Sequence, residues 1–351
     1  MRTVDWDYEH QQVRMIDQRL LPGKFEVVSF EDYHQVADAI REMVVRGAPA
    51  IGASAAFGMA LAAQTLPADG IGELRSNLGI AAEHLKASRP TAINLTWAVE
   101  RILRVVNRTE IESIPEMRTA VLEQAQRIAD EDVEINRRMA EHGASLIKEN
   151  ETIIHHCNTG ALATVDWGTA LGVIRMAHEQ GKKPYVLVDE TRPRLQGARL
   201  TAWELDQYGI SYDLITDNAA GYFLQNGKVD RVLVGADRVA ANGDVANKIG
   251  TYMLALAARD NQVPFFAVVP TSTVDLALSH GNQIPIEERD QAEVLGIEVG
   301  GERVAPNGAS ARNPAFDITP NYLITAIVTE NGVVYPPFED TLHKVVPEIL
   351  S

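Results

Sequence analysis

From about residue 150 onward, short apolar runs alternate with stretches of helical pattern. The runs cover residues 152–156, 185–188, 212–215, 231–234 and 265–269. This alternation predicts βαβ units and therefore a parallel sheet. Residues 186–188 and 267–269 are apolar throughout, which is typical of strands covered on both faces. We therefore predict an α/β fold in which residues 141–351 form a Rossmann-like domain with an open, doubly wound parallel sheet.

Residues 1–140 have a mainly helical pattern instead. Helical periodicity begins near Glu31, the Ala-rich segment 51–66 is apolar nearly all round, and a long periodic pattern covers residues 115–147. Residues 13–20 have the pattern of a short strand. The 351 residues fit about two domains of roughly 150 residues each. We expect a mainly helical N-terminal domain, 1–140, followed by the sheet domain, 141–351.

Composition excludes several classes of protein. Asp and Glu number 48 against 32 Lys and Arg, a net charge of −16, whereas a nucleic-acid binder needs a basic face. The single cysteine, Cys157, excludes an internal disulfide framework and a cysteine-rich zinc site. The nine dispersed histidines form no HExxH motif, and no P-loop or GxGxxG motif is present, so we expect neither metal nor cofactor. The polar N-terminus and the lack of a long apolar run predict a soluble, cytoplasmic protein without a membrane segment.

Polar residues follow the apolar runs, and ligands bind outside the carboxyl ends of the strands in sheets of this kind. Cys157 follows the first run at an expected junction between strand and helix, where a helix N-terminus favours the reactive thiolate. The alternative is a small buried apolar side chain. His155 and His156 point to opposite faces of the strand, so at most one of them shares the surroundings of Cys157.

Asp237 follows the run at 231–234 and two small residues, Gly235 and Ala236. Its carboxyl group is a candidate general acid or base if partial burial favours the protonated form. The alternatives are a helix N-cap and an ion pair with Arg238. The sequence does not decide between the catalytic role, the N-cap and the ion pair.

Three cationic segments are candidates for binding an anion. Arg46 and Gly47 precede an apolar helix whose N-terminus offers backbone N–H groups, although a simple corner between helices has the same pattern. Arg89 precedes a proline, and Asn247-Lys248 is expected to open a helix over 249–258. Only a fold that brings these segments together creates a phosphate pocket.

Six segments resemble the methylthioribose-1-phosphate isomerase family and occur in the same order as in that family. They are RGAPAIG at 46–52, HCNTG at 156–160, DETRPRLQG at 189–197, GADR at 235–238, NKIGTY at 247–252 and NPAFD at 313–317. The resemblance covers nearly the whole chain. It implies a mainly helical N-terminal domain that contributes phosphate-binding residues, a Rossmann-like catalytic domain and a homodimer. It also implies an aldose–ketose isomerase of methionine salvage, which converts 5-methylthio-α-D-ribose 1-phosphate to 5-methylthio-D-ribulose 1-phosphate.

The resemblance also implies roles for individual residues. Asp237 looks like the proton donor and Cys157 like the residue that acts on the transition state. The implied substrate-binding residues are Arg46, Gly47, Ala48, Arg89, Gln196, Asn247 and Lys248. Two routes for moving hydrogen from C2 to C1 stay open: proton transfer through an enol phosphate, with the Cys157 thiolate as base, or a direct hydride shift.

Two other functions compete with this hypothesis. An isomerase of ribose 1,5-bisphosphate needs groups for a second phosphate at C5, whereas a methylthio group, or the methyl of 5-deoxyribose 1-phosphate, needs an apolar slot. The family also resembles regulatory subunits of the eukaryotic translation-initiation exchange factor. A non-catalytic subunit of that kind needs neither Cys157 nor Asp237.

Overall fold

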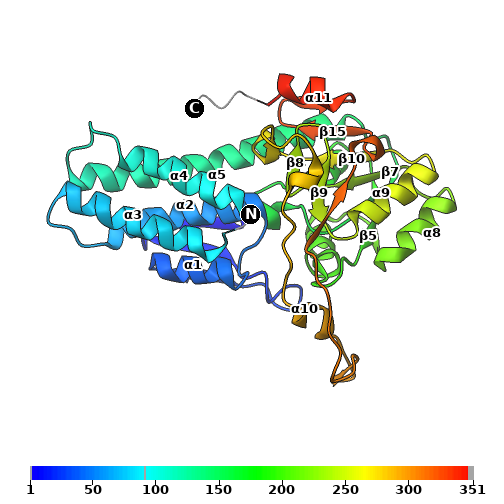
Figure 1. Ribbon diagram of the computed structural model, residues 1–351, viewed down its shortest axis with the longest axis horizontal. Helices are drawn as coiled ribbons and strands as arrows, with labels where there is room; N and C mark the ends of the chain where they lie inside the picture. The colour runs from blue at the N-terminus through cyan, green and yellow to red at the C-terminus, as the bar shows by residue number, and fades with distance from the viewer. Residues whose placement is uncertain (1, 91, 347–351) are drawn as a thin grey trace. The chain divides into compact units, whose positions relative to one another are not determined.

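The computed structural model describes residues 2–90 and 92–346, and it has the predicted α/β fold (Figure 1). The chain divides into two compact units. Unit 1 comprises Met1–Arg137 and Thr159–Gly168, and unit 2 comprises Arg138–Asn158 and Thr169–Ser351. The chain passes from unit 2 to unit 1 after Asn158 and returns to unit 2 at Thr169. A ten-residue segment from the middle of the chain therefore belongs to unit 1. A domain boundary after residue 140 stays a prediction.

Helices make up most of unit 1, as its sequence pattern predicts. They are α1 (Tyr33–Arg41), α2 (Ala48–Thr65), α3 (Ile71–Ser88), α4 (Ile93–Val106) and most of α5 (Ile114–Ala144). Every residue of α2 from Ala50 to Ala63 is buried, because its small side chains let neighbouring helices approach closely. The first helix ends at Arg41, earlier than its periodicity suggests, since Met43 has a left-handed backbone with φ of 61°.

Unit 1 also contains a small antiparallel sheet, of which the sequence revealed only one strand. Its order is β1 (Val4–Asp7), β2 (Gln12–Ile16) and β3 (Val27–Phe30). The alternate side chains of Val4, Trp6, Val13 and Met15 are buried in the core of the unit. Trp6 stacks on Phe57 of α2 with ring centroids 6.2 Å apart. The sheet therefore packs on the buried helix.

Unit 2 is built on a seven-stranded sheet whose order is β16-β15-β10-β7-β4-β5-β6. The strands are β4 (Thr152–His155), β5 (Tyr185–Asp189), β6 (Tyr212–Ile215), β7 (Arg231–Val234), β10 (Phe265–Val268), β15 (Ala326–Thr329) and β16 (Gly332–Val334). All neighbours pair in parallel except β15 and β16. The five apolar runs are thus confirmed as strands of a parallel sheet. The strand order reverses at β4, and a reversal of this kind opens a crevice for ligands at the carboxyl ends of the strands.

The helices of unit 2 lie between these strands in sequence, except for the last, which follows β16. They are α6 (Ala170–Glu179), α7 (Ala202–Tyr208), α8 (Ala220–Gln225), α9 (Thr251–Asp260), α10 (Ala292–Leu295) and α11 (Phe338–Thr341). Trp167, which fits the periodicity of α6, lies before it with a φ of 68°. In the described part of the chain, none of the helices combines the length and the apolar character needed to cross a bilayer.

A second sheet in unit 2 was not predicted. It has the order β11-β8-β9-β14, with β8 (Arg238–Ala240), β9 (Val245–Lys248), β11 (Val274–Asp275) and β14 (Phe316–Thr319). A short hairpin of β12 (Glu298–Val299) and β13 (Glu302–Arg303) follows α10. The prediction that Asn247 and Lys248 open a helix is therefore wrong. Both end a strand, because β14 pairs with β9 along its whole length, and α9 begins three residues later.

Candidate active site

Cys157 and Asp237 follow two strands that are direct neighbours in the sheet. In the register of β4 and β7, His155 is paired with Leu233, so both strands end at the same edge. Cys157 comes two residues after His155, and Asp237 four residues after Leu233. The structure thus places both candidate catalytic residues at the reversal in strand order, on the side where ligands bind.

The backbone of Cys157 is held in an unusual conformation. Its φ is 67°, a left-handed value that costs a non-glycine residue about 1–3 kcal/mol. Its N–H donates to Thr191 Oγ1 at 2.8 Å, and its carbonyl oxygen accepts from Thr201 Oγ1 at 2.7 Å. The side chain is buried. These two hydrogen bonds hold the strained backbone and with it the direction of the thiol.

The expected helix N-terminus at Cys157 is not present. The first helical element after it is a 3₁₀ turn, Ala161–Ala163, and the first α-helix begins at Ala170. The segment that directly follows Cys157 therefore does not supply the expected helix N-terminus. The two neighbouring histidines do lie on opposite faces, as predicted, since His155 Nδ1 donates to the Leu233 carbonyl and His156 contacts Asp189 instead.

Asp237 lies in the short connection between β7 and β8 and is exposed. The structure does not show the partial burial that would favour the protonated form of its carboxyl group. Its N–H donates to the Ala246 carbonyl at 2.9 Å, which fixes the connection to β9. Because β8 begins at the next residue, Asp237 is not a helix N-cap, and Arg238 forms an ion pair with Asp275 at 3.2 Å. Asp237 is thus an exposed residue whose backbone is held by a hydrogen bond to β9.

Gln196 lies on the loop that follows β5. It precedes a π-helical turn, Gly197–Thr201, and turns of this type are frequent at functional sites. Gly197 is packed so closely on β5 that a Cβ atom would lie 1.7 Å from the Asp189 carbonyl oxygen. Gln196 is buried, and its Oε1 accepts no hydrogen bond from the described residues. An unsatisfied buried amide oxygen is costly, and a hydroxyl group of a ligand would satisfy it.

Asn247 and Lys248 are both buried at the end of β9. Lys248 Nζ donates to the Ala315 carbonyl at 3.0 Å and lies 4.9 Å from the centre of the Phe316 ring. Asn247 Nδ2 donates to Thr251 Oγ1 at 3.0 Å. The charge of Lys248 also interacts with the Asp317 carboxylate. An ammonium group is a strong hydrogen-bond donor to an anionic ligand.

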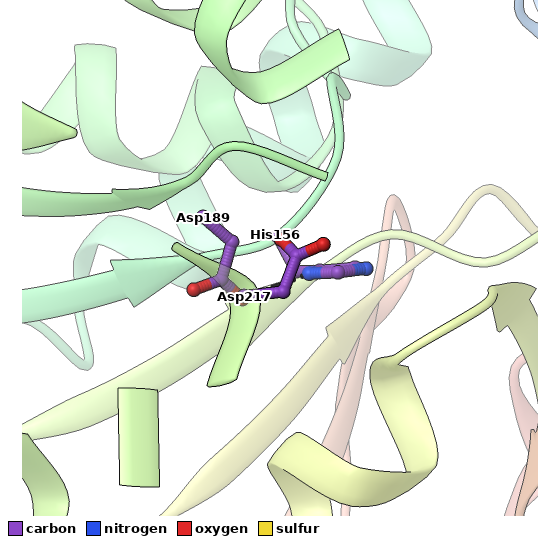
Figure 2. Close-up of side chains that lie close together, drawn as sticks. All are labelled: His156, Asp189 and Asp217. Atoms are coloured by element: carbon purple, nitrogen blue, oxygen red, sulfur yellow. Dashed lines mark hydrogen bonds and ion pairs between the residues drawn. The ribbon is translucent and has the colours of Figure 1, made fainter. Parts of the chain in front are cut away.

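The loops after β4, β5 and β6 meet in a buried network around His156 (Figure 2). His156 Nδ1 lies 2.8 Å from Asp189 Oδ2, and both side chains are 1% exposed. Asp217 accepts from the N–H groups of Thr191 and Arg192, each at 2.7 Å. Its two oxygens therefore fix the same loop that holds Cys157.

Burial and mutual contact shift the pKa values of this pair. Burial raises the pKa of Asp189 to about 6, although its hydrogen bond to His156 acts in the opposite direction. Burial alone would lower the pKa of His156, but the hydrogen bond and charge of Asp189 outweigh it and raise the pKa. His156 Nε2 faces the Ile249 carbonyl oxygen at 2.9 Å, which can only accept. The ring therefore keeps a proton on Nε2, and a second proton lies between Nδ1 and Asp189.

His156, Asp189 and Asp217 also have the residue types of a metal site, with one possible ligand atom of each within 4.8 Å of the others. However, His156 and Asp189 are bonded to each other, and both Asp217 oxygens accept backbone N–H groups. These contacts are those of a hydrogen-bonded network and not of a coordination sphere.

Unit 1 brings the other candidate residues to one end of α2. Gly47 is its N-cap with a φ of 99°, Ala48 is its first residue, and Arg46 lies just before. A Cβ atom on Gly52 would lie 2.9 Å from the Asn94 carbonyl oxygen, which places the start of α2 beside that of α4. Arg89 ends α3 five residues before Asn94, and both arginines are half-buried. The helix N-terminus and two nearby cationic segments have the composition of an anion site.

Sequence reasoning missed several residues that organise the site. Thr191 and Asp217 follow apolar runs but were not singled out, and Phe316 and Asp317 were named only as part of the segment 313–317. Asp317 accepts from the N–H groups of Gly250 and Tyr252 and so shapes the turn after Lys248. The repeated placement of polar residues directly after strands was the signal for the first two, and nothing in the local sequence indicated the last two.

Comparison with known proteins identifies the family. Residues 44–336 match the model of the initiation factor 2 subunit family. A methylthioribose-1-phosphate isomerase from Acetivibrio thermocellus is 51% identical over 96% of this chain and 98% of its own length. A relative with the same name from Desulforamulus reducens is 50% identical over 98% of this chain and 99% of its own length. Another, from a Synechococcus strain, is 51% identical over 95% of this chain and 95% of its own length.

Solved structures agree with the sequence comparison. The 5-methylthioribose 1-phosphate isomerase from Pyrococcus horikoshii OT3 superposes with a TM-score of 0.92 at 49% identity, covering 98% of this chain and 95% of that one. The translation initiation factor eIF-2B, subunit delta, from A. fulgidus superposes with a TM-score of 0.89 at 44% identity, covering 99% of each chain. The chain belongs to the initiation factor 2 subunit family and, within it, to the methylthioribose-1-phosphate isomerases.

Proposed function

We propose that this protein catalyses the isomerisation of 5-methylthio-α-D-ribose 1-phosphate to 5-methylthio-D-ribulose 1-phosphate in methionine salvage. Its full-length relatives at about 50% identity carry that activity in their names. The observation that carries the proposal in the structure is the position of Cys157 and Asp237 after two neighbouring parallel strands. A reacting sugar placed at this edge of the sheet would meet a thiol and a carboxyl group together.

The proposed substrate-binding residues divide by chemistry. Lys248, Arg46 and Arg89 would neutralise the phosphate, and the N–H groups at Gly47 and Ala48 would add hydrogen bonds from a helix N-terminus. Asn247 and Gln196 would bind sugar hydroxyl groups, and the unsatisfied Oε1 of Gln196 supports this role. Each group is neutral or cationic, as an anionic ligand requires.

The reaction begins with ring opening, because the phosphate blocks the anomeric oxygen and no free aldehyde can form first. Asp237, in its protonated form, donates to the ring oxygen as the bond between that oxygen and C1 breaks. The hydrogen on C2 then moves to C1, and the 2-hydroxyl group loses its proton to become the ketone. The anionic phosphate group on C1 disperses the positive charge that develops there as the bond breaks. Because Asp237 is exposed in the structure, we propose that the bound substrate supplies the cover that favours its protonated form.

Transfer of the C2 hydrogen has two routes that an isotope experiment separates. In the first, the Cys157 thiolate removes a proton from C2 and an enol phosphate is protonated at C1. In the second, hydride shifts directly from C2 to C1, and Cys157 stabilises the charge that develops. Turnover in deuterium oxide places deuterium at C1 in the first route and leaves C1 without it in the second.

We further propose that unit 2 is of the Rossmann-like, doubly wound type and that the protein is a cytoplasmic homodimer without a cofactor. The strand order, which reverses at β4, supports the first statement. The sedimentation velocity of the purified protein tests the second, with the mass of two 38.4 kDa chains as the expected result.

Turnover of methylthioribose 1-phosphate, followed by phosphorus and proton NMR without added metal or nucleotide, tests the proposed function. Formation of the ketose 1-phosphate is the expected result. Binding without conversion would instead favour a regulatory subunit of the kind to which the family is related. Conversion of ribose 1,5-bisphosphate in preference to the methylthio sugar would assign a different substrate to the same site.

A further inference from the structure

We infer that His156 is a positioning residue: with Asp189, it fixes the strand end that carries Cys157 against the turn that follows Asn247 and Lys248. The inference rests on the proposed function, in which one segment reacts with the sugar and the other binds it. Misplacement of a reacting group by about 1 Å can cost on the order of 10²-fold in rate. A residue that joins these two segments therefore affects the reaction without touching the substrate.

The first contacts are those of the imidazole itself. Nε2 donates to the Ile249 carbonyl at 2.9 Å, and Nδ1 shares a proton with Asp189 Oδ2 at 2.8 Å. Ile249 directly follows Lys248, and His156 directly precedes Cys157. The ring is 1% exposed, so water does not compete for either hydrogen bond.

The turn at Gly250 packs closely against the imidazole ring of His156. Gly250 has a φ of 103°, and a Cβ atom there would lie 3.0 Å from His156 Cε1. Asp317 accepts from the N–H groups of Gly250 and Tyr252, at 2.8 and 3.0 Å. The imidazole therefore lies directly against a turn whose backbone is fixed from the other side.

Asp189 also holds Cys157 through the hydroxyl group of Thr191. Its backbone carbonyl accepts from Thr191 Oγ1 at 3.0 Å, and that hydroxyl oxygen accepts from the Cys157 N–H. The side chain of Asp189 orients His156, and its main chain orients the hydroxyl group that binds Cys157. One residue thus fixes both neighbours in the dipeptide His156-Cys157.

The adjacent histidine provides a matched control. His155 is fully buried, and its Nδ1 donates to the Leu233 carbonyl at 2.9 Å, within the sheet. Burial lowers the pKa of His155 to about 4, so its ring is neutral. His155 and His156 therefore differ in what they join, although both are buried side chains bonded to a backbone carbonyl.

The experiment compares H156Q with H155Q, and D189A with D189N, in the full-length chain. An asparagine at 189 can donate to Nδ1 of a neutral ring, so that Nε2 still bonds to Ile249. We expect H156Q and D189A to lower kcat/KM by about 10²-fold, through both a lower kcat and a higher KM. We expect H155Q and D189N to stay within about tenfold of the wild type in kcat/KM. The other charged groups that interact with the pair, Asp217, Glu190 and Asp317, are the same in all four variants.

A second readout does not depend on turnover. The thiol of Cys157 is 8% exposed and belongs to the one cysteine of the chain, so alkylation by iodoacetamide reports this residue alone. We expect H156Q to be alkylated at least about tenfold faster than the wild type and than H155Q, because the strand end opens locally. The same comparison remains valid if H156Q loses stability overall, since circular dichroism identifies the folded fraction.

The outcomes separate this inference from the proposed function. A wild-type protein that does not convert the substrate refutes the proposed function, whatever the variants do. In an active protein, H156Q with unchanged kcat and KM overturns the positioning role. Equal losses in D189N and D189A overturn it as well, because they would assign the effect to the charge of Asp189 and not to the orientation of the ring.

Discussion

Gly47 lies against Ala163 so closely that a Cβ atom on Gly47 would be 2.2 Å from the Ala163 carbonyl oxygen. The two residues are separated by most of unit 1 in sequence, and Ala163 belongs to the segment Thr159–Gly168. Thr3 and Gln18 hold the same segment by hydrogen bonds to the carbonyls of Ala161 and Leu162, at 2.6 and 2.7 Å. The start of α2 is thus packed against a loop that other parts of unit 1 fix in place.

Replacement of Gly47 by alanine tests this packing. The φ of 99° costs an alanine about 1–3 kcal/mol, and the clash with Ala163 adds to that cost. We expect G47A to lower the free energy of unfolding in urea and to raise KM for the sugar phosphate. Gly79 lies inside α3 with nothing within 4 Å of an added Cβ, so G79A should be neutral or stabilising by up to about 1 kcal/mol. A G47A variant as stable as G79A would contradict the packing described here.

Asp237 is the proposed proton donor. General acid catalysis contributes about 10²–10⁴-fold to a rate, so D237N should lower kcat by at least about 10²-fold. Its stability should change little, because the side chain is exposed. Asp260, an exposed carboxylate at the end of α9, serves as the control, and D260N should keep full activity. Turnover by D237N at the wild-type rate would remove Asp237 from the mechanism.

Lys248 supplies a buried positive charge at the end of β9. A hydrogen bond to a charged group is worth about 1.5–3 kcal/mol, which corresponds to roughly 10- to 100-fold in affinity. We therefore expect K248M to raise the dissociation constant of the substrate by that factor in isothermal titration calorimetry. Lys344 is exposed, and K344M should bind as the wild type does. Equal affinities of K248M and K344M would place the phosphate elsewhere.

The pair of His156 and Asp189 makes stability depend on pH in a defined direction. The pKa of Asp189 is raised from its ordinary value of 3.8 to about 6, and that of His156 is raised as well. The folded state therefore binds more protons than the unfolded state, and this contribution to stability falls as pH rises through the folded pKa values. D189N cannot share the proton. We expect the Tm difference between wild type and D189N to decrease by at least about 2 °C between pH 4 and pH 7.

A buried ion pair lies at the N-terminal ends of β4 and β7, whereas Cys157 and Asp237 follow their C-terminal ends. This pair allows stability to be tested separately from activity. Arg231 Nε donates to Glu151 Oε2 at 2.6 Å, and a second N–H group donates to the other carboxylate oxygen. Loss of one partner leaves a buried charge without compensation, so E151Q should cost about 3–5 kcal/mol in unfolding free energy. The kcat at 25 °C should be unchanged. E179Q, which breaks the ion pair with Arg175 on the surface of α6, should cost far less.

Five strands of the large sheet were predictable because each contains a short apolar run, whereas β15 and β16 were not predicted. Residues 186–188 are buried on both faces, as are the strands β10 and β15. Helix α2 was predictable for the same reason. The strand at Asn247 and Lys248 was not predictable, because these two residues pair with β14, some 70 residues away, and local propensity does not encode such pairing.

Candidate site residues that directly follow strands could be predicted from the sequence. Their exposure and backbone conformation could not, because these depend on contacts with other parts of the chain. Cys157 and Asp237 were found from their position after apolar runs. The exposure of Asp237 and the left-handed backbone of Cys157 follow from tertiary contacts with Ala246, Thr191 and Thr201. Those contacts join different strands and loops, and no local pattern predicts them.

The segment Thr159–Gly168 leaves one unit directly after the Cys157 strand end and returns to it at Thr169. Neither unit is consequently a continuous stretch of gene. A fragment that ends at residue 140 lacks the ten residues that contact Thr3, Gln18 and Gly47, and a fragment that starts there carries them without their partners. A single crossover after residue 140 therefore cannot transfer either unit intact.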